Sequence, residues 1–322
     1  MTEVRTTATL VAVLVVVSVA VAAVPAAAGP LTGANEATEE SNAKTTPNPA
    51  TAGSDSDGSP PAALVRECEY PFEYTDDTGT TVTISEDPDR VVAMAPSAAQ
   101  TMWEIGGKDE VVGVSRLSYY LDGAGEKANI SAPGFGRYNV ERIVALEPDV
   151  VLAPNVVRTS AVDGLREAGV EVVKFPAATS IEDVENKTRL IGHLTGNCEG
   201  AVDAVAWMEA NLDAIESAVA DADRPSVLYS LGGGYTVGRN TFIDDTITAA
   251  RATNIVSAAN ISGYPEINEE LVVTRDPEYL LVTAPDPPIA RQSPYNSTTA
   301  VREGNIVVVN PNYLNQPAPR TA

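Results

Sequence analysis

From about residue 80 onward, short apolar runs alternate with amphipathic stretches. Apolar runs with the length of strands lie at 90–95, 111–114, 150–153 and 170–175, and 81–84 alternates between polar and apolar residues like a half-buried strand. The amphipathic ranges 97–105, 139–146 and 161–168 separate them, and Ser97 is the expected N-cap of the first. Uninterrupted apolar runs are typical of strands that are buried on both faces of a parallel sheet. The alternation therefore predicts a parallel α/β lobe.

A second set of strands and helices follows a long helical region. Range 181–194 is amphipathic, and 200–220 reads as one long helix with apolar positions at spacings of three and four. Further strands are expected at 226–231, 279–283 and 305–309, with helices at 244–252 and 268–274. The second half of the chain is thus of the same α/β kind as the first.

The N-terminal part of the chain differs in composition. Arg5 precedes an apolar run at 8–23, and three alanines stand before Gly29, as at a signal-peptide cleavage site. We expect residues 1–28 to be a signal peptide; a retained membrane anchor is the alternative, because the run is near the lower limit for spanning a bilayer. Residues 29–67 are rich in Ser, Thr, Gly, Pro and Asn, which predicts a disordered linker that tethers the folded part to the membrane.

The net charge of the chain limits the classes of partner that it can bind. The 322 residues include 44 Asp and Glu against 21 Lys and Arg, for a formal net charge of −23. Such a surface repels nucleic acid and anionic lipid, so we expect neither as a partner. It is typical of proteins that stay soluble in concentrated salt, with an ordinary acidic extracellular protein as the alternative.

The two cysteines, Cys68 and Cys198, are expected to form a disulfide. Outside the cell, two thiols in one folded domain pair more often than they bind a metal. The sequence holds no CxxC motif, and His193 is its one histidine. We therefore expect no metal site, and two separate buried thiols are the alternative to the disulfide.

Four sequons of the type Asn-x-Ser/Thr are candidates for glycosylation. In an exported protein such sites mark surface positions, although the triplet is common by chance. They begin at Asn129, Asn186, Asn260 and Asn296.

Several segments resemble the vitamin B12 and iron–siderophore binding proteins, which deliver metal chelates to ABC importers. In the first half they are 90–96, the run Asn139-Val140-Glu141-Arg142-Ile143-Val144-Ala145-Leu146-Glu147-Pro148-Asp149, and 169–172. In the second half they are 235–238, 241–244 and 264–270. The resemblance implies two α/β lobes joined by a single long helix, with the ligand cleft between the lobes. It divides the chain into a first lobe at 68–179, a helical connector at 180–222 and a second lobe at 223–322.

The resemblance carries two further expectations. Members of this family usually continue with a C-terminal helix after the segment that matches 317–320, so the second lobe is expected to be truncated. They also carry a surface glutamate on each lobe that pairs with arginines of the permease dimer. The matching positions here are Glu141 and Glu270. The alternative role for each is favourable interaction with the helix dipole in a first turn.

Candidate ligand-binding residues lie on loops that follow the predicted strands. Open α/β sheets bind ligands at the carboxyl ends of their strands. Aromatic residues make up only 5% of the chain, yet six of them fall on these loops, where flat apolar surface suits a large planar ligand. The candidates are Pro96, Ser97, Tyr119, Tyr120, Phe135, Gly136, Arg137, Tyr138, Asn155, Gly233, Tyr235 and Tyr264.

The sequence favours a binding protein over an enzyme. Gly232-Gly233-Gly234 lacks the Lys and the spacing of a phosphate loop, so it indicates a tight turn or a close backbone approach to the ligand. Neither a nucleophile with a partner base nor a Gly-x-Ser-x-Gly motif occurs. We expect a monomer without a cofactor that captures a metal chelate. Only Arg116 and Arg137 lie on the first-lobe loops, which favours a neutral corrinoid such as cobalamin; a ferric siderophore of the hydroxamate type is the alternative.

Overall fold

The computed structural model of the protein describes residues 67–284 and 287–322. The expected signal peptide at 1–28 and all but the last residue of the expected linker at 29–67 lie outside these ranges. Within the described residues, no helix combines the length and the apolar character needed to cross a bilayer.

Five parallel strands form the sheet of the first lobe, in the order β5-β4-β3-β6-β7. They are β3 (Val91–Ala93), β4 (Val111–Val114), β5 (Ala128–Asn129), β6 (Val150–Ala153) and β7 (Val172–Lys174). In β6, Val150 and Leu152 pack into the core on one face, and Val151 and Ala153 into the core on the other. Because successive side chains of a strand point to opposite faces, a strand covered on both sides needs an uninterrupted apolar run.

Helices cover both faces of this sheet. One face packs against α2 (Pro96–Glu104), α5 (Ile181–Leu194) and the start of α6 (Cys198–Val219), and the other against α3 (Val140–Val144) and α4 (Thr159–Glu167).

The start of α2 differs from the sequence prediction. The expectation of Ser97 as N-cap is wrong: Ala95 is the N-cap, and Ser97 is buried inside the helix. Pro96 explains the shift, since its fixed φ and missing N–H suit the first helical position.

Four parallel strands form the sheet of the second lobe, in the order β11-β10-β8-β9. They are β8 (Ser226–Tyr229), β9 (Thr253–Asn254), β10 (Tyr279–Val282) and β11 (Ile306–Val308). One face packs against α7 (Phe242–Ala249) and the middle of α6. The other face packs against α8 (Ile255–Ala258), α9 (Glu269–Arg275), α10 (Pro288–Arg291) and α11 (Thr299–Arg302).

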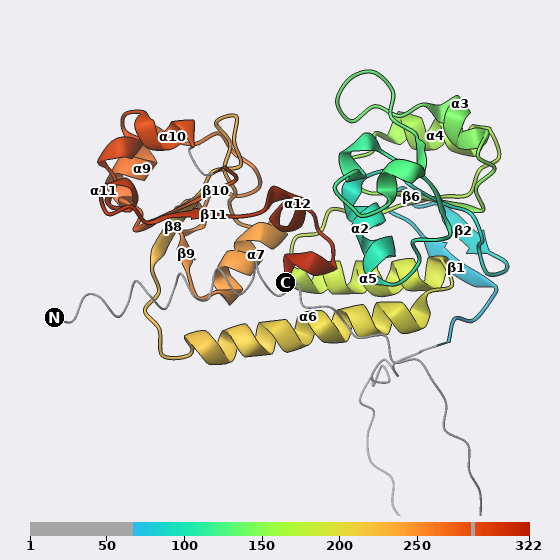
Figure 1. The fold of residues 1–322 in the computed structure, drawn as a ribbon, viewed down its shortest axis with the longest axis horizontal. Helices are drawn as coiled ribbons and strands as arrows, with labels where there is room; N and C mark the ends of the chain where they lie inside the picture. The colour runs from blue at the N-terminus through green and yellow to red at the C-terminus, as the bar shows by residue number, and fades with distance from the viewer. Residues whose placement is uncertain (1–66, 285–286) are drawn as a thin grey trace, which may run out of the picture.

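Helix α6 runs beneath both lobes (Figure 1). It has 22 residues, which gives a length of about 33 Å at the usual rise per residue. Ala201 and Ala204 pack into the core of the first lobe, and Met208, one turn later, packs into the core of the second. The predicted architecture of two α/β lobes joined by a single long helix is confirmed.

The C-terminal segment makes a second connection between the lobes. After β11 it forms α12 (Pro311–Leu314) and the 3-10 turn η4 (Pro319–Thr321), which contacts α2, α5 and α6. Arg320 Nε lies 2.5 Å from Glu104 Oε1 in α2. Gln100, also in α2, donates from Nε2 to the carbonyl of Asn312 at 3.3 Å. The C-terminal segment therefore holds the lobes together in addition to α6 and to α5, whose Val184 packs into the second core and whose Leu194 packs into the first.

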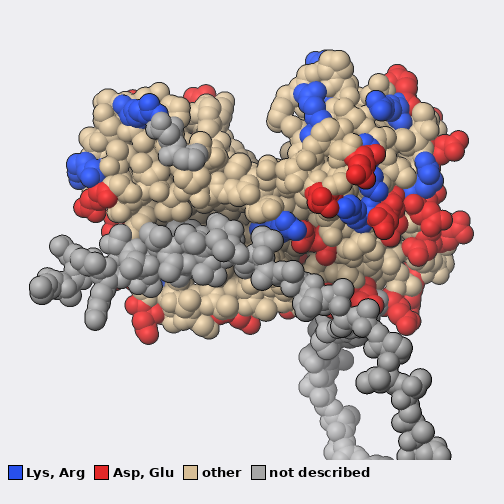
Figure 2. Space-filling view, viewed as in Figure 1, with Lys and Arg blue, Asp and Glu red and all other residues tan. Residues whose placement is uncertain are grey.

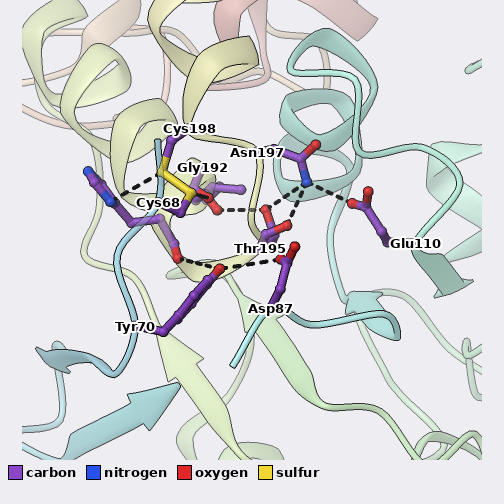
Figure 3. The surroundings of a disulfide bond; sticks show 10 residues. Cys68, Tyr70, Asp87, Glu110, Gly192, Thr195, Asn197 and Cys198 are labelled. Carbon is purple, nitrogen blue, oxygen red and sulfur yellow. Dashed lines mark hydrogen bonds between the residues drawn. A yellow bond between two sulfur atoms is a disulfide. The ribbon is translucent and has the colours of Figure 1, made fainter. Parts of the chain in front are cut away.

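The Cys68–Cys198 disulfide is confirmed (Figure 3). It joins the segment before the antiparallel hairpin of β1 (Phe72–Thr75) and β2 (Thr81–Ile84) to the first residue of α6. Around it, Tyr70 donates to the carbonyl of His193 at 3.3 Å, and Asn197 donates to Glu110 at 2.7 Å. The disulfide is therefore surrounded by hydrogen-bonded residues at the N-terminal end of α6.

Candidate ligand cleft

The molecule is hollowed between the two lobes (Figure 2). In the first lobe, β3 is central and the chain builds the sheet outward from it in both directions, which is the topology that opens a crevice at the carboxyl ends of the strands. The loops after β4, β5 and β6 leave this edge of the first lobe, and the loop after β8 leaves the corresponding edge of the second.

Exposed apolar side chains gather on these loops. Of the nine large apolar side chains that are exposed in the described ranges, six lie in segments that connect the strands and helices: Leu117 and Tyr119 after β4, Phe135 after β5, Val156 after β6, Tyr235 after β8 and Tyr264 before α9. Phe135 is 84% exposed and Val156 is 65% exposed. Soluble proteins rarely expose apolar side chains in groups except where a ligand or partner covers them.

The first-lobe loops are held by their own hydrogen bonds. Phe135 stands at the tip of a loop that is closed by a bond from the N–H of Ala132 to the carbonyl of Arg137 at 2.9 Å. The hydroxyl of Ser131 accepts from the N–H of Arg116 at 3.0 Å, which ties this loop to the one after β4. The wall of the first lobe is therefore built from linked segments.

The second-lobe wall depends on a turn of three glycines. Gly232, Gly233 and Gly234 all have φ between 62° and 91°, which residues with a Cβ rarely adopt. The turn is closed by a bond from the N–H of Tyr235 to the carbonyl of Gly232 at 3.1 Å. The glycine run thus forms the tight turn that the sequence indicated, and Tyr235 follows it directly.

Tyr264 belongs to the same wall. The N–H of Thr236 donates to the carbonyl of Pro265 at 3.0 Å, and the N–H of Gly238 donates to that of Gly263 at 2.8 Å. These bonds place the backbone of Tyr264 beside the segment that carries Tyr235. The second lobe therefore presents two exposed tyrosines from paired segments.

Two of the predicted aromatic residues are placed differently from the other four. Tyr120 packs against the core of the first lobe, and Tyr138 packs against the core on the opposite face of the same sheet. Burial raises the pKa of Tyr138 to about 12, and it also raises the pKa of Tyr120. Their rings support the loops, whereas Tyr119, Phe135, Tyr235 and Tyr264 are exposed.

The other predicted ligand-binding residues also differ in their exposure to solvent. Asn155, Gly233 and Arg137 are exposed, Pro96 and Gly136 are half-buried, and Ser97 is buried. The sequence reasoning missed Leu117 and Val156. Both are apolar residues on loops just after a strand, and this was the signal that could have identified them.

Few charges face the hollow. Arg116 and Arg137 are exposed on the first-lobe loops, and no ion pair of either is found among the described residues. On the face shown in Figure 2, Asp and Glu gather on the outer flank of the first lobe, while the walls of the hollow consist mainly of other residues. The excess acidity of the chain thus lies largely away from the cleft on this face.

Comparison with known proteins identifies the family. The model of the periplasmic binding protein family matches residues 91–313. This chain belongs to that family. The cobalamin-binding protein of Halobacterium salinarum is 45% identical over 266 residues, which cover 79% of this chain and 72% of that protein.

Solved structures have the same fold. The periplasmic vitamin B12 binding protein of Vibrio cholerae has a TM-score of 0.62 and 21% identity, over 73% of this chain and 92% of its own. The ABC-type Fe3+-hydroxamate transport protein of Saccharomonospora viridis has a TM-score of 0.63 and 25% identity, over 79% of this chain and 96% of its own.

In this periplasmic binding protein, Glu141 and Glu270 occupy equivalent local structures. Glu141 lies in the first turn of α3, where Asn139 Oδ1 accepts from the N–H of Arg142 at 2.8 Å. Glu270 lies in the first turn of α9, where Asn268 Oδ1 accepts from the N–H of Leu271 at 2.9 Å. Both glutamates are exposed, and the first turn of α9 also carries the exposed Glu269.

The four sequons lie in different environments. Asn129 is half-buried in β5, and its side chain accepts from the N–H of Ser131 at 2.9 Å. Asn186, Asn260 and Asn296 are exposed. Asn260 also has an intramolecular partner, because its Oδ1 accepts from the guanidinium of Arg239 at 2.6 Å.

Two other features of the described residues lie apart from the cleft. Cys68, His193 and Cys198 bring possible ligand atoms within 4.8 Å of one another, but both sulfurs are in the disulfide and are not thiolates. An apolar hollow of about 810 Å³, part of it open solvent, lies between α6, α7 and the C-terminal segment. It is lined by Leu212, Ile215, Ile247, Ala250, Leu281, Val309, Leu314 and Ala322, among others.

Proposed function

We propose that this protein is the exported solute-binding component of an ABC importer and that it captures a corrinoid, cobalamin, in the cleft between its lobes. The protein would remain at the outer face of the membrane, tethered through residues 29–67, and deliver its ligand to a permease dimer. The apolar run near the N-terminus supports export.

The concentration of exposed apolar side chains in the cleft carries the proposal. Tyr119 and Phe135 are exposed on loops of the first lobe, and Tyr235 and Tyr264 are exposed on paired segments of the second. Flat rings on both sides suit a large planar ligand, and the tyrosine hydroxyls supply hydrogen bonds to its polar edge. The 45% identical relative named a cobalamin-binding protein supports the same ligand.

A ferric hydroxamate chelate is the second candidate. The likeness to the Fe3+-hydroxamate transport protein supports it, as does the neutral character of such chelates. An anionic catecholate chelate fits less well, because a cleft for a multiply charged anion needs several cations, and Arg116 and Arg137 are the exposed cations of the candidate loops 115–120 and 135–138.

A direct binding measurement tests the ligand. Purified protein is incubated with cyanocobalamin or with a ferric hydroxamate and desalted, and the visible absorption that stays with the protein is recorded. Titration calorimetry of each ligand then gives the affinity. We expect sub-micromolar binding of cyanocobalamin; no heat with cyanocobalamin but saturable heat with the hydroxamate would reverse the choice of ligand.

Substitution of the cleft aromatics tests the site. Phe135→Ala and Tyr235→Ala each remove an exposed ring from one wall, and each is expected to weaken cyanocobalamin binding by about tenfold or more. Trp207→Ala is the matched control, because Trp207 is also an exposed aromatic but lies on α6. Equal effects of all three substitutions would show that the cleft loops do not hold the ligand.

We further propose that Glu141 and Glu270 dock the protein onto the permease. Their equivalent positions on α3 and α9 support a contact with two related membrane subunits. Exposed interfacial charges chiefly set the rate and register of association, so their loss should spare the cleft. We expect Glu141→Arg with Glu270→Arg to keep ligand affinity within a few-fold and to abolish uptake by the reconstituted importer.

Glu216→Arg supplies the control for docking. Glu216 is exposed on α6, and its reversal changes the net charge without touching α3 or α9. Normal uptake by the double variant, or loss of its ligand affinity, would show that Glu141 and Glu270 are not the docking pair.

A further inference from the structure

One buried cation contacts the cleft wall from behind. Lys174 is the last residue of β7, and it is only 5% exposed. Its Nζ donates to the carbonyls of Pro154, Asn155 and Val157 at 3.0, 2.8 and 2.5 Å. An ammonium has three N–H donors, so all the donors of Lys174 are used on one short loop.

This loop, residues 154–157, follows β6 and forms part of the cleft wall. Its Val156 side chain is 65% exposed, while three of its carbonyls converge on Lys174. The N–H of Val157 also donates to the carbonyl of Pro154 at 2.9 Å, which closes the turn. The carbonyl of Pro154 keeps this donor without Lys174, but those of Asn155 and Val157 would lose the donor that the ammonium supplies, which is costly at a buried site.

A network of fixed charges holds Lys174 in place. The carboxylate of Asp76, at the turn between β1 and β2, accepts from the backbone N–H of Lys174 at 2.8 Å. The same carboxylate pairs with Arg166 of α4 at 2.5 Å. The buried ammonium therefore has acceptors for all its protons and an anchored backbone, as a buried charge requires.

We propose that Lys174 is a positioning residue for the ligand cleft: it holds the carbonyls of loop 154–157 inward, so that Asn155 and Val156 face the ligand in a fixed shape. This inference rests on the proposed function for its ligand, whereas the effect on the loop is independent of the ligand's identity. Preorganisation of the wall increases affinity because the loop loses less freedom when the ligand binds.

Lys174→Met tests the proposal, since methionine keeps an unbranched apolar stem and removes all three donors. We expect amide hydrogen exchange at Val157 to accelerate by about tenfold or more. We expect the affinity for cyanocobalamin to fall by a similar factor. Lys174→Gln, with two N–H donors on a shorter stem, should give intermediate values, and it keeps the test available if the methionine variant folds poorly.

Arg166→Met is the matched control. It removes the cation that is paired with Asp76, together with its bond to the carbonyl of Val172 in β7, and it removes none of the bonds between Lys174 Nζ and the loop. We expect it to lower stability but to keep exchange at Val157 and ligand affinity within about two-fold of wild type. Unchanged exchange in Lys174→Met, or equal losses of affinity in Lys174→Met and Arg166→Met, would overturn the proposal. If wild-type protein does not bind cyanocobalamin, the proposed ligand fails, while the exchange comparison still decides the role of Lys174.

Discussion

Replacing both cysteines, Cys68→Ser with Cys198→Ser, should destabilise the first lobe without weakening the cleft. The disulfide joins residues 130 positions apart, and this closed loop contains all five strands of the first sheet and none of the second. In the chain-entropy model, a closure of that length contributes about 5 kcal/mol to the free energy of unfolding. Total stabilities of domains are about 5–15 kcal/mol, so the expected loss is large.

The assay is equilibrium unfolding in denaturant, followed by tryptophan fluorescence. The chain has two tryptophans, and Trp103 lies in α2 of the first lobe while Trp207 lies in α6. Wild-type protein unfolded with a reducing agent present is the control, and it should lose a similar amount of stability. Because the disulfide lies at the N-terminal end of α6 and the cleft loops lie at the carboxyl ends of the strands, ligand affinity should stay within about two-fold.

Two outcomes would refute this reasoning. A double variant that loses less than about 1 kcal/mol would mean that the unfolded chain is already restricted in other ways. A large loss of ligand affinity with little loss of stability would mean that the disulfide shapes the cleft directly.

Three further predictions concern charge. The chain has 23 more acidic than basic residues, and their negative charges repel one another in the folded protein. Salt screens this repulsion, so the melting temperature should rise from dilute buffer to molar KCl. An unchanged or lower melting temperature would contradict this. Burial lowers the pKa of Lys187 to about 7 from its ordinary 10.5. Between these two pH values the unfolded chain therefore binds one more proton than the folded protein, so the free energy of unfolding should rise with pH above about 7. Lys187→Met should remove this rise. If denaturant titrations of the variant show the same dependence on pH as wild type, Lys187 is not its cause. A double-mutant cycle on Glu104 and Arg320 should give a favourable coupling of about 0.5–1 kcal/mol that falls in molar KCl. A coupling that cannot be distinguished from zero would show that this ion pair does not stabilise the contact between the lobes.

The periodicity of apolar residues within a short segment correctly predicted several strands and helices. The apolar runs gave β4 and β6 and the amphipathic period gave α5 with the bounds that the structure has. The two-residue strands β5 and β9 were not predicted, because their only strand character is pairing with a neighbour that lies elsewhere in the chain. The strand β1 was missed for the same reason, since it is half exposed and defined by its pairing with β2.

For the candidate site, the sequence predicted which loops carry aromatic residues but not which of those side chains are exposed. Loop aromatics were visible in the sequence, but whether a ring is exposed like Tyr119 or packed like Tyr120 depends on the core behind it. The contact of Lys174 with loop 154–157 joins two strands that are neighbours in space but are separated by α4 in sequence. No spacing rule in a single sequence connects such residues.

The connections between the lobes have a consequence for how empty and loaded protein compete for the importer. Helix α6 and the C-terminal segment both join the lobes, which leaves little room for a large closing movement. The faces that carry Glu141 and Glu270 should then keep nearly the same separation in empty and loaded protein. Under the docking proposed for these glutamates, empty molecules should occupy the permease almost as readily as loaded ones. The rate of uptake would then follow the loaded fraction of the population, and overproduction of the binding protein at scarce ligand would slow transport.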